Sequence, residues 1–260
     1  MRVDQMLVER GLATSRSQAQ RLIAGGVRWR LAGGEWRKAA KNGDEVPQDA
    51  EVELLDDAEA RYVSRGGLKL EGALAASGVT VDGRDCLDVG QSTGGFTDCL
   101  LRHGAARVVG VDVGHGQLNE SLRGAARMLC IEGVNARELS AAGLQQAYAA
   151  APEPGAWPVA FDLVVGDLSF ISLTLVLPAI VPLVKSGGEL LMLVKPQFEL
   201  QPAQIGKGGI VKDAASHAVV ERRIRDCCAG LGLQVQRWFD SPIAGGDGNR
   251  EFFVLATNQS

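Results

Sequence analysis

The sequence predicts an α/β fold, in which a doubly wound and mainly parallel sheet follows a small basic unit. From residue 85 onward, short runs of Val, Leu and Ile alternate with segments of helical spacing, as in parallel sheets covered by helices. Residues 1–43 carry nine Lys and Arg against three Asp and Glu, whereas residues 44–60 carry eight acidic residues and no basic one. With 260 residues, 46% of them hydrophobic, the chain can form one large domain and a small companion.

Two helices and a basic hairpin are predicted in the first part of the chain. Apolar residues recur at helical spacing between residues 2 and 11, and Ser15 is suited to open a second helix that runs to about Ile23. The pair Gly25-Gly26 closes this helix, and residues 27–36 have the pattern of a short hairpin. These elements form a compact α+β unit.

The remaining residues, 66–260, are expected to form one domain, joined through a linker at 61–65 to the domain of residues 1–60. Its candidate strands are apolar on both faces, which is typical of a sheet buried between two layers of helices. The segment 172–184 has helical spacing and is interpreted as core or domain packing. The six candidate strands are residues 86–89, 108–112, 128–131, 163–165, 190–194 and 252–256.

A glycine-rich turn at the end of the first candidate strand predicts a ligand site. Residues 88–97 read Asp-Val-Gly-Gln-Ser-Thr-Gly-Gly-Phe-Thr, and open α/β sheets bind ligands at the edge where such a turn lies. Asp112 ends the next strand, 22 residues after Gly90, where a carboxylate can accept hydrogen bonds from both hydroxyls of a ribose. The predicted cofactor-binding residues are therefore Asp88, Gly90, Ser92, Thr93, Gly94, Gly95, Phe96 and Asp112.

The residues of this turn favour S-adenosylmethionine over a cofactor that carries phosphate. A dinucleotide fingerprint needs glycine where Ser92 stands, and the Gly-Lys-Ser/Thr triplet of a phosphate loop does not occur. Asp88 would repel a pyrophosphate but would pair with an ammonium group. S-adenosylmethionine has an ammonium group and a sulfonium and no phosphate, so it fits best; a purely structural turn is the alternative.

Composition and spacing exclude several other classes of protein. The longest weakly polar run, residues 171–184, has 14 residues, fewer than the roughly 20 that span a bilayer. No secretory signal follows Met1, so we expect a cytoplasmic protein with no membrane partner. The five cysteines form no C-x-x-C and the three histidines have no metal-ligand spacing, so we expect reduced thiols and no metal.

The basic N-terminal stretch contains an ordered set of residues: Arg2, Asp4, Arg10-Gly11, Ser15-Arg16, Ala19, Leu22-Ile23 and Gly25-Gly26-Val27. This set resembles the small RNA-binding domain shared with ribosomal protein S4. Guanidinium groups match phosphate geometry, and their binding releases counterions. The arginines are thus expected to bind RNA, with a solvated charged face as the alternative. The predicted RNA-binding residues are Arg2, Arg10, Arg16, Arg21, Arg28 and Arg30.

Ordered motifs extend over nearly the whole chain. They include residues 64–70, 87–90, 92–98, 112–114, 116–118, 167–172, 195–199, 206–213 and 248–251. In these motifs the sequence resembles the TlyA (hemolysin A-like) family of ribosomal RNA methyltransferases, whose catalytic domain is of the FtsJ-like, ribose 2'-O type. The resemblance implies a Rossmann-like methyltransferase sheet, S-adenosylmethionine as cofactor, and ribosomal RNA or ribosomal subunits as partner.

The resemblance also implies a catalytic tetrad of Lys69, Asp167, Lys195 and Glu251. A ribose hydroxyl attacks well only if its proton is removed or shared, so a base must lie within hydrogen-bond reach. We expect Lys195 to be that base, made neutral by burial beside Lys69, while Asp167 and Glu251 orient the two amines. In a competing scheme Lys195 stays protonated and only positions and polarises the hydroxyl.

Two further segments are assigned through the resemblance. Asn135 falls where the family has an Asn-x-Arg segment and is expected to bracket the adenine together with Glu132, although a simple loop role is equally open; Asp167 is also expected to touch the cofactor. Residues 206–213 are expected to form a mobile loop, in which Lys207 and Lys212 can reach RNA phosphates.

The sequence departs from the family pattern at three positions: Gln91 replaces a small residue of the turn, His115 a common tyrosine, and Gly133 a frequent arginine. We expect Gln91 to crowd the methionine part of the cofactor or to shift its contacts.

The leading function is methyl transfer from S-adenosylmethionine to a ribose 2'-hydroxyl of 16S or 23S ribosomal RNA, with the N-terminal domain holding the RNA. One alternative is a non-catalytic RNA-binding factor of ribosome assembly that keeps a degenerate cofactor pocket. The other is a secreted membrane lysin, which the hemolysin label suggests and which the missing signal and spanning segment disfavour. The oligomeric state stays open.

Overall fold

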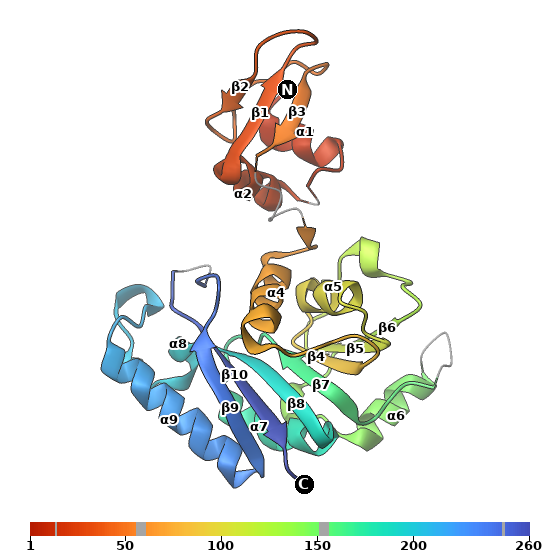
Figure 1. Cartoon of the computed structure of the whole chain (residues 1–260), viewed down its shortest axis with the longest axis vertical. Coiled ribbons are helices and arrows are strands. Elements are labelled where there is room, and N and C mark those ends of the chain that lie inside the picture. Colours follow the sequence, from red (N-terminus) through yellow and green to blue (C-terminus); the bar gives the residue numbers. More distant parts are fainter. Residues whose placement is uncertain (14, 56–60, 151–155, 246–247) are drawn as a thin grey trace. The chain divides into compact units, whose positions relative to one another are not determined.

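The computed structural model consists of two compact units, Met1–Leu68 and Lys69–Ser260, each with its own hydrophobic core (Figure 1). It describes residues 1–13, 15–55, 61–150, 156–245 and 248–260. The division between the units falls inside helix α4 (Arg65–Ser77), shortly after the predicted linker. The domain limits at residues 60 and 66 stay a prediction, and the acidic residues 56–60 lie outside the described part.

The first unit packs two helices against a three-stranded antiparallel sheet of order β2-β1-β3. Both predicted helices are confirmed, and so is the hairpin, which extends to Ala39. Ser15 opens the second helix as predicted, because its side chain accepts a hydrogen bond from the Gln18 amide at 3.2 Å. The elements are α1 (Val3–Glu9), α2 (Arg16–Gly26), β1 (Val27–Arg30), β2 (Arg37–Ala39) and β3 (Glu51–Leu54).

Two features of this unit differ from the prediction. Helix α2 ends at Gly26 instead of near Ile23, since the glycine pair forms its last turn; Gly26, at φ +120°, then leads directly into β1. Strand β3 is not predicted, because its residues lie in the acidic stretch. Its two glutamates alternate with Val52 and Leu54, which pack against the core of the unit, and this period of two is typical of a strand.

The second unit is built on a seven-stranded sheet of order β6-β5-β4-β7-β8-β10-β9. Neighbouring strands from β6 to β8 pair in parallel, whereas β10 is antiparallel to both β8 and β9. The doubly wound α/β class and the six predicted strands are confirmed. Strand β9 is not predicted, because it is only partly buried and contains no apolar run. The strands are β4 (Asp85–Val89), β5 (Arg107–Asp112), β6 (Met128–Glu132), β7 (Phe161–Gly166), β8 (Val184–Val194), β9 (Leu233–Asp240) and β10 (Phe252–Asn258).

Helices cover both faces of this sheet (Figure 1). Helices α6, α7 and α9 share one buried cluster with the strands, whereas α5 lies on the opposite face with α4 and stacks Phe96 on Phe253 of β10 at 6.4 Å. The helices after α4 are α5 (Gly95–Arg102), α6 (Ala141–Ala149), α7 (Leu173–Ile180), α8 (Pro196–Glu199) and α9 (Ala214–Gly230). Short 3-10 turns are η1 (Glu120–Leu122), η2 (Ala136–Glu138), η3 (Val181–Leu183), η4 (Pro202–Gln204) and η5 (Lys207–Gly209).

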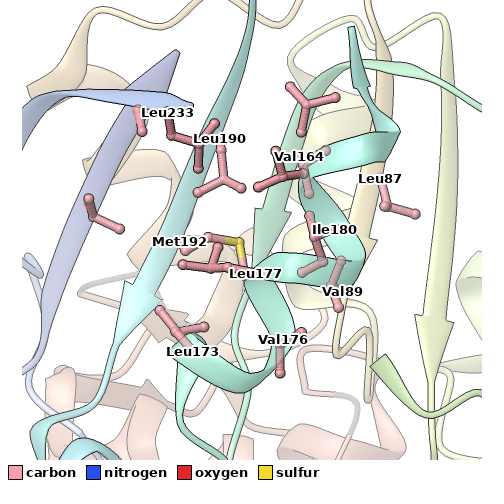
Figure 2. Packing of buried hydrophobic residues seen from close by; sticks show 14 of the residues in the cluster. Leu87, Val89, Val164, Leu173, Val176, Leu177, Ile180, Leu190, Met192 and Leu233 are labelled. Atoms are coloured by element: carbon pink, nitrogen blue, oxygen red, sulfur yellow. The ribbon is translucent and has the colours of Figure 1, made fainter. Parts of the chain in front are cut away.

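Helix α7 covers the middle of one face of the sheet. Its apolar residues follow the spacing i, i+3, i+4, i+7 of a buried helix stripe, and Figure 2 shows them in one cluster with Val164 and Met192 of the strands. The core interpretation of this segment is confirmed, although the helix ends at Ile180 and β8 begins at Val184. The four buried α7 residues are Leu173, Val176, Leu177 and Ile180.

The described helices include none that is long and apolar enough to cross a membrane. Within the same part of the chain, no three His, Cys, Asp or Glu side chains gather into a metal site. All five cysteines are free thiols, and three of them are buried.

Candidate active site and basic surface

The carboxyl edge of the large sheet collects the predicted tetrad. Asp167 follows β7 and Lys195 follows β8, two neighbouring parallel strands. Because β10 is antiparallel to β8, with its first residue opposite the last residue of β8, Glu251 just before β10 lies at this same edge. Lys69 comes from helix α4. The topology thus brings together four side chains that are distant in the sequence.

Two lysine–carboxylate pairs form the centre of the site. Lys69 Nζ donates a hydrogen bond to Glu251 Oε2 at 2.6 Å, and these side chains are 10% and 2% exposed. Lys195 Nζ lies 2.5 Å from Asp167 Oδ1 and donates a hydrogen bond to Ser169 Oγ at 2.8 Å. Burial raises the pKa of Glu251, although Lys69 and Lys195 act to lower it. Each amine is thus held in place by a carboxylate.

Two adjoining cavities meet at these pairs. The tetrad cavity, of about 460 Å³, is lined by three of the four residues, while Asp167 lines the turn cavity, of about 490 Å³, beside the glycine-rich turn. Ser169 and Phe170 line both cavities. The arrangement therefore offers two neighbouring reactants separate places, with a lysine–carboxylate pair between them.

The turn cavity contains part of the predicted cofactor set. Asp112 Oδ2 accepts a hydrogen bond from the Ser92 amide and Oδ1 one from the Gly114 amide, both at 2.7 Å. A carboxylate has about four acceptor positions, so Asp112 keeps capacity for ribose hydroxyls. The predicted residues that line this cavity are Gly90, Ser92, Asp112, Asn135 and Asp167.

The backbone of the turn is shaped for close approach. Gly90 has φ +84°, and a Cβ there would lie 2.9 Å from the Asp167 carbonyl oxygen, so only glycine fits. Ser92 has φ +49° without being glycine, and its Oγ donates a hydrogen bond to Gln117 Oε1 at 3.1 Å. Gln117 also lines the cavity. It is not predicted as a site residue, although its motif, residues 116–118, is recognisable.

The other predicted turn residues do not line the cavity. Gly94 is the N-cap of α5, and the Phe96 side chain packs on Phe253. Thr93 and Gly95 likewise belong to the turn and the start of α5 and contribute their backbone to its shape. A direct contact of these four residues with a cofactor stays a prediction.

Asp88 and Gln91 point into the protein. Asp88 is fully buried and accepts a hydrogen bond from Thr97 Oγ1 at 2.7 Å, and Gln91 Nε2 donates to the same Thr97 Oγ1 at 2.8 Å. Burial raises the pKa of Asp88 to about 7. A Cβ at Gly110 would lie 2.0 Å from the Gln91 side chain, which fills the space over that glycine. The Gln91 side chain therefore does not line the turn cavity, and its expected effect on the methionine part of the cofactor, by crowding or by shifted contacts, stays a prediction.

The other two departures from the family pattern are neighbours. A Cβ at Gly133 would lie 2.9 Å from His115 Nε2, so the glycine leaves room for the imidazole. Nearby, Asn135 lines the turn cavity, whereas Glu132 Oε1 accepts a hydrogen bond from the Gly116 amide at 2.7 Å and does not line it. Of the two residues only Asn135 lines the turn cavity, and the contact of either residue with adenine stays a prediction.

The loop of residues 206–213 is tied to the tetrad edge by an unpredicted residue. Asn249 is fully buried; its Nδ2 donates to the Gly209 carbonyl at 3.0 Å, and its Oδ1 accepts from the Val211 amide at 2.9 Å. Lys212 is exposed, and the side chain of Lys207 lies outside the described part. In the sequence, only the motif at residues 248–251 pointed to Asn249.

Phe170 is an exposed aromatic residue beside the tetrad. Its side chain is 91% exposed, and its backbone has φ +63°, an uncommon conformation that is concentrated at functional sites. Its ring lies 5.1 Å from that of Phe198. No role is predicted for it from the sequence, because neither the exposure nor the backbone angle can be read there.

The basic surface of the first unit contains arginines that already have partners. Arg2 Nε lies 3.0 Å and Arg16 Nη2 3.5 Å from the fully buried carboxylate of Asp4, and the hydrogen bond from Arg2 holds the pKa of Asp4 below its usual value. Arg10 donates to two backbone carbonyls, at 2.6 and 2.7 Å. Arg21 is half-buried on α2.

Arg28 and Arg30 of β1 each pair with a glutamate of β3 across the small sheet. Their Nε atoms donate to Glu53 at 2.8 Å and to Glu51 at 2.6 Å, and both guanidinium groups lie over Trp36, at 4.8 and 4.5 Å from the ring centroid. These two arginine side chains are still 37% and 35% exposed. RNA phosphates would compete with the two glutamates for them, so their predicted role stays a prediction.

Known proteins match both units of the chain. The FtsJ-like methyltransferase model matches residues 62–258, and the S4 domain model matches residues 1–26. The chain is 43% identical over 263 residues to the 16S/23S rRNA (cytidine-2'-O)-methyltransferase TlyA of Mycobacterium tuberculosis, covering 100% of this chain and 90% of that protein. It is 34% identical to Hemolysin A of Brachyspira hyodysenteriae, covering 98% of each.

The fold is matched as well. A solved structure of a candidate hemolysin from Streptococcus thermophilus has a TM-score of 0.74 at 36% identity, covering 100% of this chain and 89% of that one. Taken with the tetrad at the sheet edge and the adjoining turn cavity, these matches show that the chain belongs to the TlyA (hemolysin A-like) family of S-adenosylmethionine-dependent ribosomal RNA 2'-O-methyltransferases.

Proposed function

We propose that this protein methylates the ribose 2'-hydroxyl of a cytidine in 16S ribosomal RNA, 23S ribosomal RNA or both, with Lys69, Asp167, Lys195 and Glu251 as its catalytic residues. The observation that carries the proposal is the convergence of two lysine–carboxylate pairs on the boundary between two cavities. The nucleoside identity follows the name of the Mycobacterium tuberculosis relative.

The turn cavity fits S-adenosylmethionine. It combines the Asp112 carboxylate for ribose hydroxyls, the tight backbone of Gly90 and Ser92, and the neighbouring Asn135. The described lining contains no lysine or arginine that would select a phosphate. When bound, S-adenosylmethionine would supply an electrophilic methyl carbon on a sulfonium.

The residues of the tetrad cavity would prepare the ribose. Lys195, fixed between Asp167 and Ser169, lies on the boundary with the turn cavity, where a hydroxyl can be held in line with the methyl carbon. Lys195 Nζ, if neutral, would accept the proton of this hydroxyl as its oxygen takes the methyl group that S-adenosylmethionine would supply, leaving the neutral thioether. Lys69 and Glu251 form the opposite wall of this cavity, and each balances the charge of the other.

The competing scheme gives Lys195 a different task in the same geometry. If Lys195 stays an ammonium group, it hydrogen-bonds to the hydroxyl oxygen, and the proton leaves to water. The two schemes differ in where the hydroxyl proton goes: to Lys195 Nζ in the first and to water in the second.

The aromatic ring of Phe170 and the first unit would hold the RNA. An exposed ring beside the tetrad can stack on a base that has left its helix, and the S4-type unit can contact phosphates through the arginines named above. A ribosomal RNA substrate also implies that the protein acts in the cytoplasm.

The decisive experiment uses the full chain and salt-washed ribosomal subunits from a strain that lacks the gene. Tritiated S-adenosylmethionine should label the RNA of one or both subunits, and mapping of 2'-O-methyl positions should find cytidines. Absence of label, with intact cofactor binding, would contradict the proposal and favour a non-catalytic RNA-binding factor. Label on a base instead of a ribose would contradict the tetrad chemistry.

A further inference from the structure

A third cavity opens on the other side of Phe170. Its volume is about 450 Å³, and no member of the tetrad lines it. Two exposed apolar side chains, Phe170 at 91% and Leu175 at 51%, lie at this cavity. Arg137 of η2 and Arg223 of α9 contribute its positive charge. The cavity therefore combines apolar surface with two cations.

The third cavity adjoins the active site. Phe170 lines the tetrad cavity, the turn cavity and the third cavity, and Phe198 lines the tetrad cavity and the third. Their rings lie 5.1 Å apart at a tilt of 48°, so this aromatic pair is the partition between the two spaces. A group in the third cavity is thus the direct neighbour of whatever occupies the tetrad cavity.

The charge of the third cavity suits an anion. Its carboxylate, Glu199, is 3% exposed and turned into the protein, where it accepts hydrogen bonds from Ser172 Oγ at 2.5 Å and the Leu173 amide at 2.7 Å. Arg223 Nη1 donates to the Glu199 carbonyl at 2.7 Å, which fixes this guanidinium and leaves its other N–H groups for a ligand. Arg137 is exposed, so both cations can meet an anion.

We propose that the third cavity binds the nucleotide adjacent to the methylated one along the RNA strand. Its phosphodiester contacts Arg137 and Arg223, and its sugar or base packs on Leu175 beyond the aromatic partition. Guanidinium groups match phosphate geometry, and stretches of single-stranded RNA are held by cations that alternate with apolar or aromatic platforms. The inference rests on the proposed function and adds a second subsite to it.

The test measures methyl transfer to salt-washed subunits by the full chain at several salt concentrations. Arg137→Ala removes a cation whose side chain has no hydrogen-bond or ion-pair partner among the described residues. As the control, Arg222→Ala removes an exposed arginine of α9, next to Arg223, that does not line the cavity. Arg137→Ala should raise the KM for subunits about five- to tenfold and lower the slope of log KM against log salt by about 0.7. The kcat at saturating subunits, the affinity for S-adenosylmethionine and the Tm should stay at wild-type values.

Arg223→Ala should act in the same direction, and Arg137→Lys should recover most of the KM because it restores the charge. Arg137→Ala and Arg222→Ala with equal KM and salt slope would overturn the subsite while leaving the methyltransferase function in place. A raised KM with an unchanged salt slope would indicate contact with a ribosomal protein instead of a phosphate and would also overturn it. A wild-type protein that methylates nothing would refute the proposed function itself.

Discussion

Both units of the chain carry pairs of basic and acidic side chains, but water reaches these pairs to very different degrees. In the large unit, Lys69 and Glu251 are 10% and 2% exposed. In the small unit, Arg28 and Glu53 are 37% and 44% exposed. Buried pairs are rigid and costly to break, because the remaining partner stays behind as an unpaired charge. Exposed pairs contribute little to stability and exchange partners easily.

This difference would suit the two proposed tasks. A catalytic pair has to hold its amine at a defined place before the substrate arrives, since reorganisation during the reaction would raise the barrier. A surface arginine that is to bind RNA has to leave its carboxylate for a phosphate, so a weak pair is an advantage. The same pairing chemistry thus gives a fixed centre in the large unit and, at Arg28 and Arg30, pairs of the small unit that could exchange their partners.

The largest effect that tests this contrast is expected from Lys195→Ala. Loss of the amine should lower kcat by about 10²–10⁴-fold, the usual contribution of a positioned acid or base, with cofactor affinity unchanged, as measured by tritium incorporation and calorimetry. Lys185→Ala is the matched control, because Lys185 lies on β8 and pairs with Asp162 at 2.8 Å. Wild-type turnover by the Lys195 variant would remove this residue from the mechanism.

Next in size is the cost of opening the buried pair. Lys69→Met leaves Glu251 buried without its partner, so the free energy of unfolding should fall by about 3 kcal/mol in urea titrations. The exposed counterpart, Arg28→Met, should change it by less than about 1 kcal/mol. Equal losses of unfolding free energy in the two variants would show that burial does not make one pair more costly to break than the other.

A third prediction concerns Asp88, a buried carboxylate without a cation. Burial raises its pKa from 3.8 to about 7, so the folded protein binds this proton more tightly than the unfolded chain does. The free energy of unfolding should therefore fall as pH rises between those two values, by about 1.4 kcal/mol per pH unit from this group. Asp88→Asn should remove this contribution. The free energy of unfolding of the variant, relative to that of wild type, should therefore rise steadily from pH 4 to 7. A constant difference would contradict the assignment.

The strands that carry the buried pairs could be predicted from the sequence. Strands β4 to β8 and β10 contain apolar runs that can be recognised from composition, and all of them except the edge strand β6 are largely buried on both faces. Strands β3 and β9 do not, because half of their residues face water and their pattern merges with charged or polar surroundings. The tetrad followed from family motifs and not from spacing, since Glu251 reaches the sheet edge through the antiparallel strand β10 and Lys69 comes from helix α4.

Side-chain direction was the part that could not be predicted. Gln91 turns into the interior over Gly110, and Asp88 lies behind the turn, because both directions depend on space left by neighbouring elements. The exposure of Phe170 depends on a positive φ at a non-glycine residue, which no pattern in one sequence reveals.

The smallest effect is expected from the exposed pair of Arg30 and Glu51. Arg30→Ala should weaken binding of ribosomal subunits a few-fold and lower the salt slope by about 0.7–0.9, the contribution of one phosphate contact. Glu51→Gln, by contrast, releases the arginine and should leave binding equal or tighter, while both variants unfold within about 1 kcal/mol of wild type. The opposite signs separate an RNA contact from a structural one: if both variants bind more weakly, the pair serves the fold of the small sheet and the exchange of carboxylate for phosphate does not take place there.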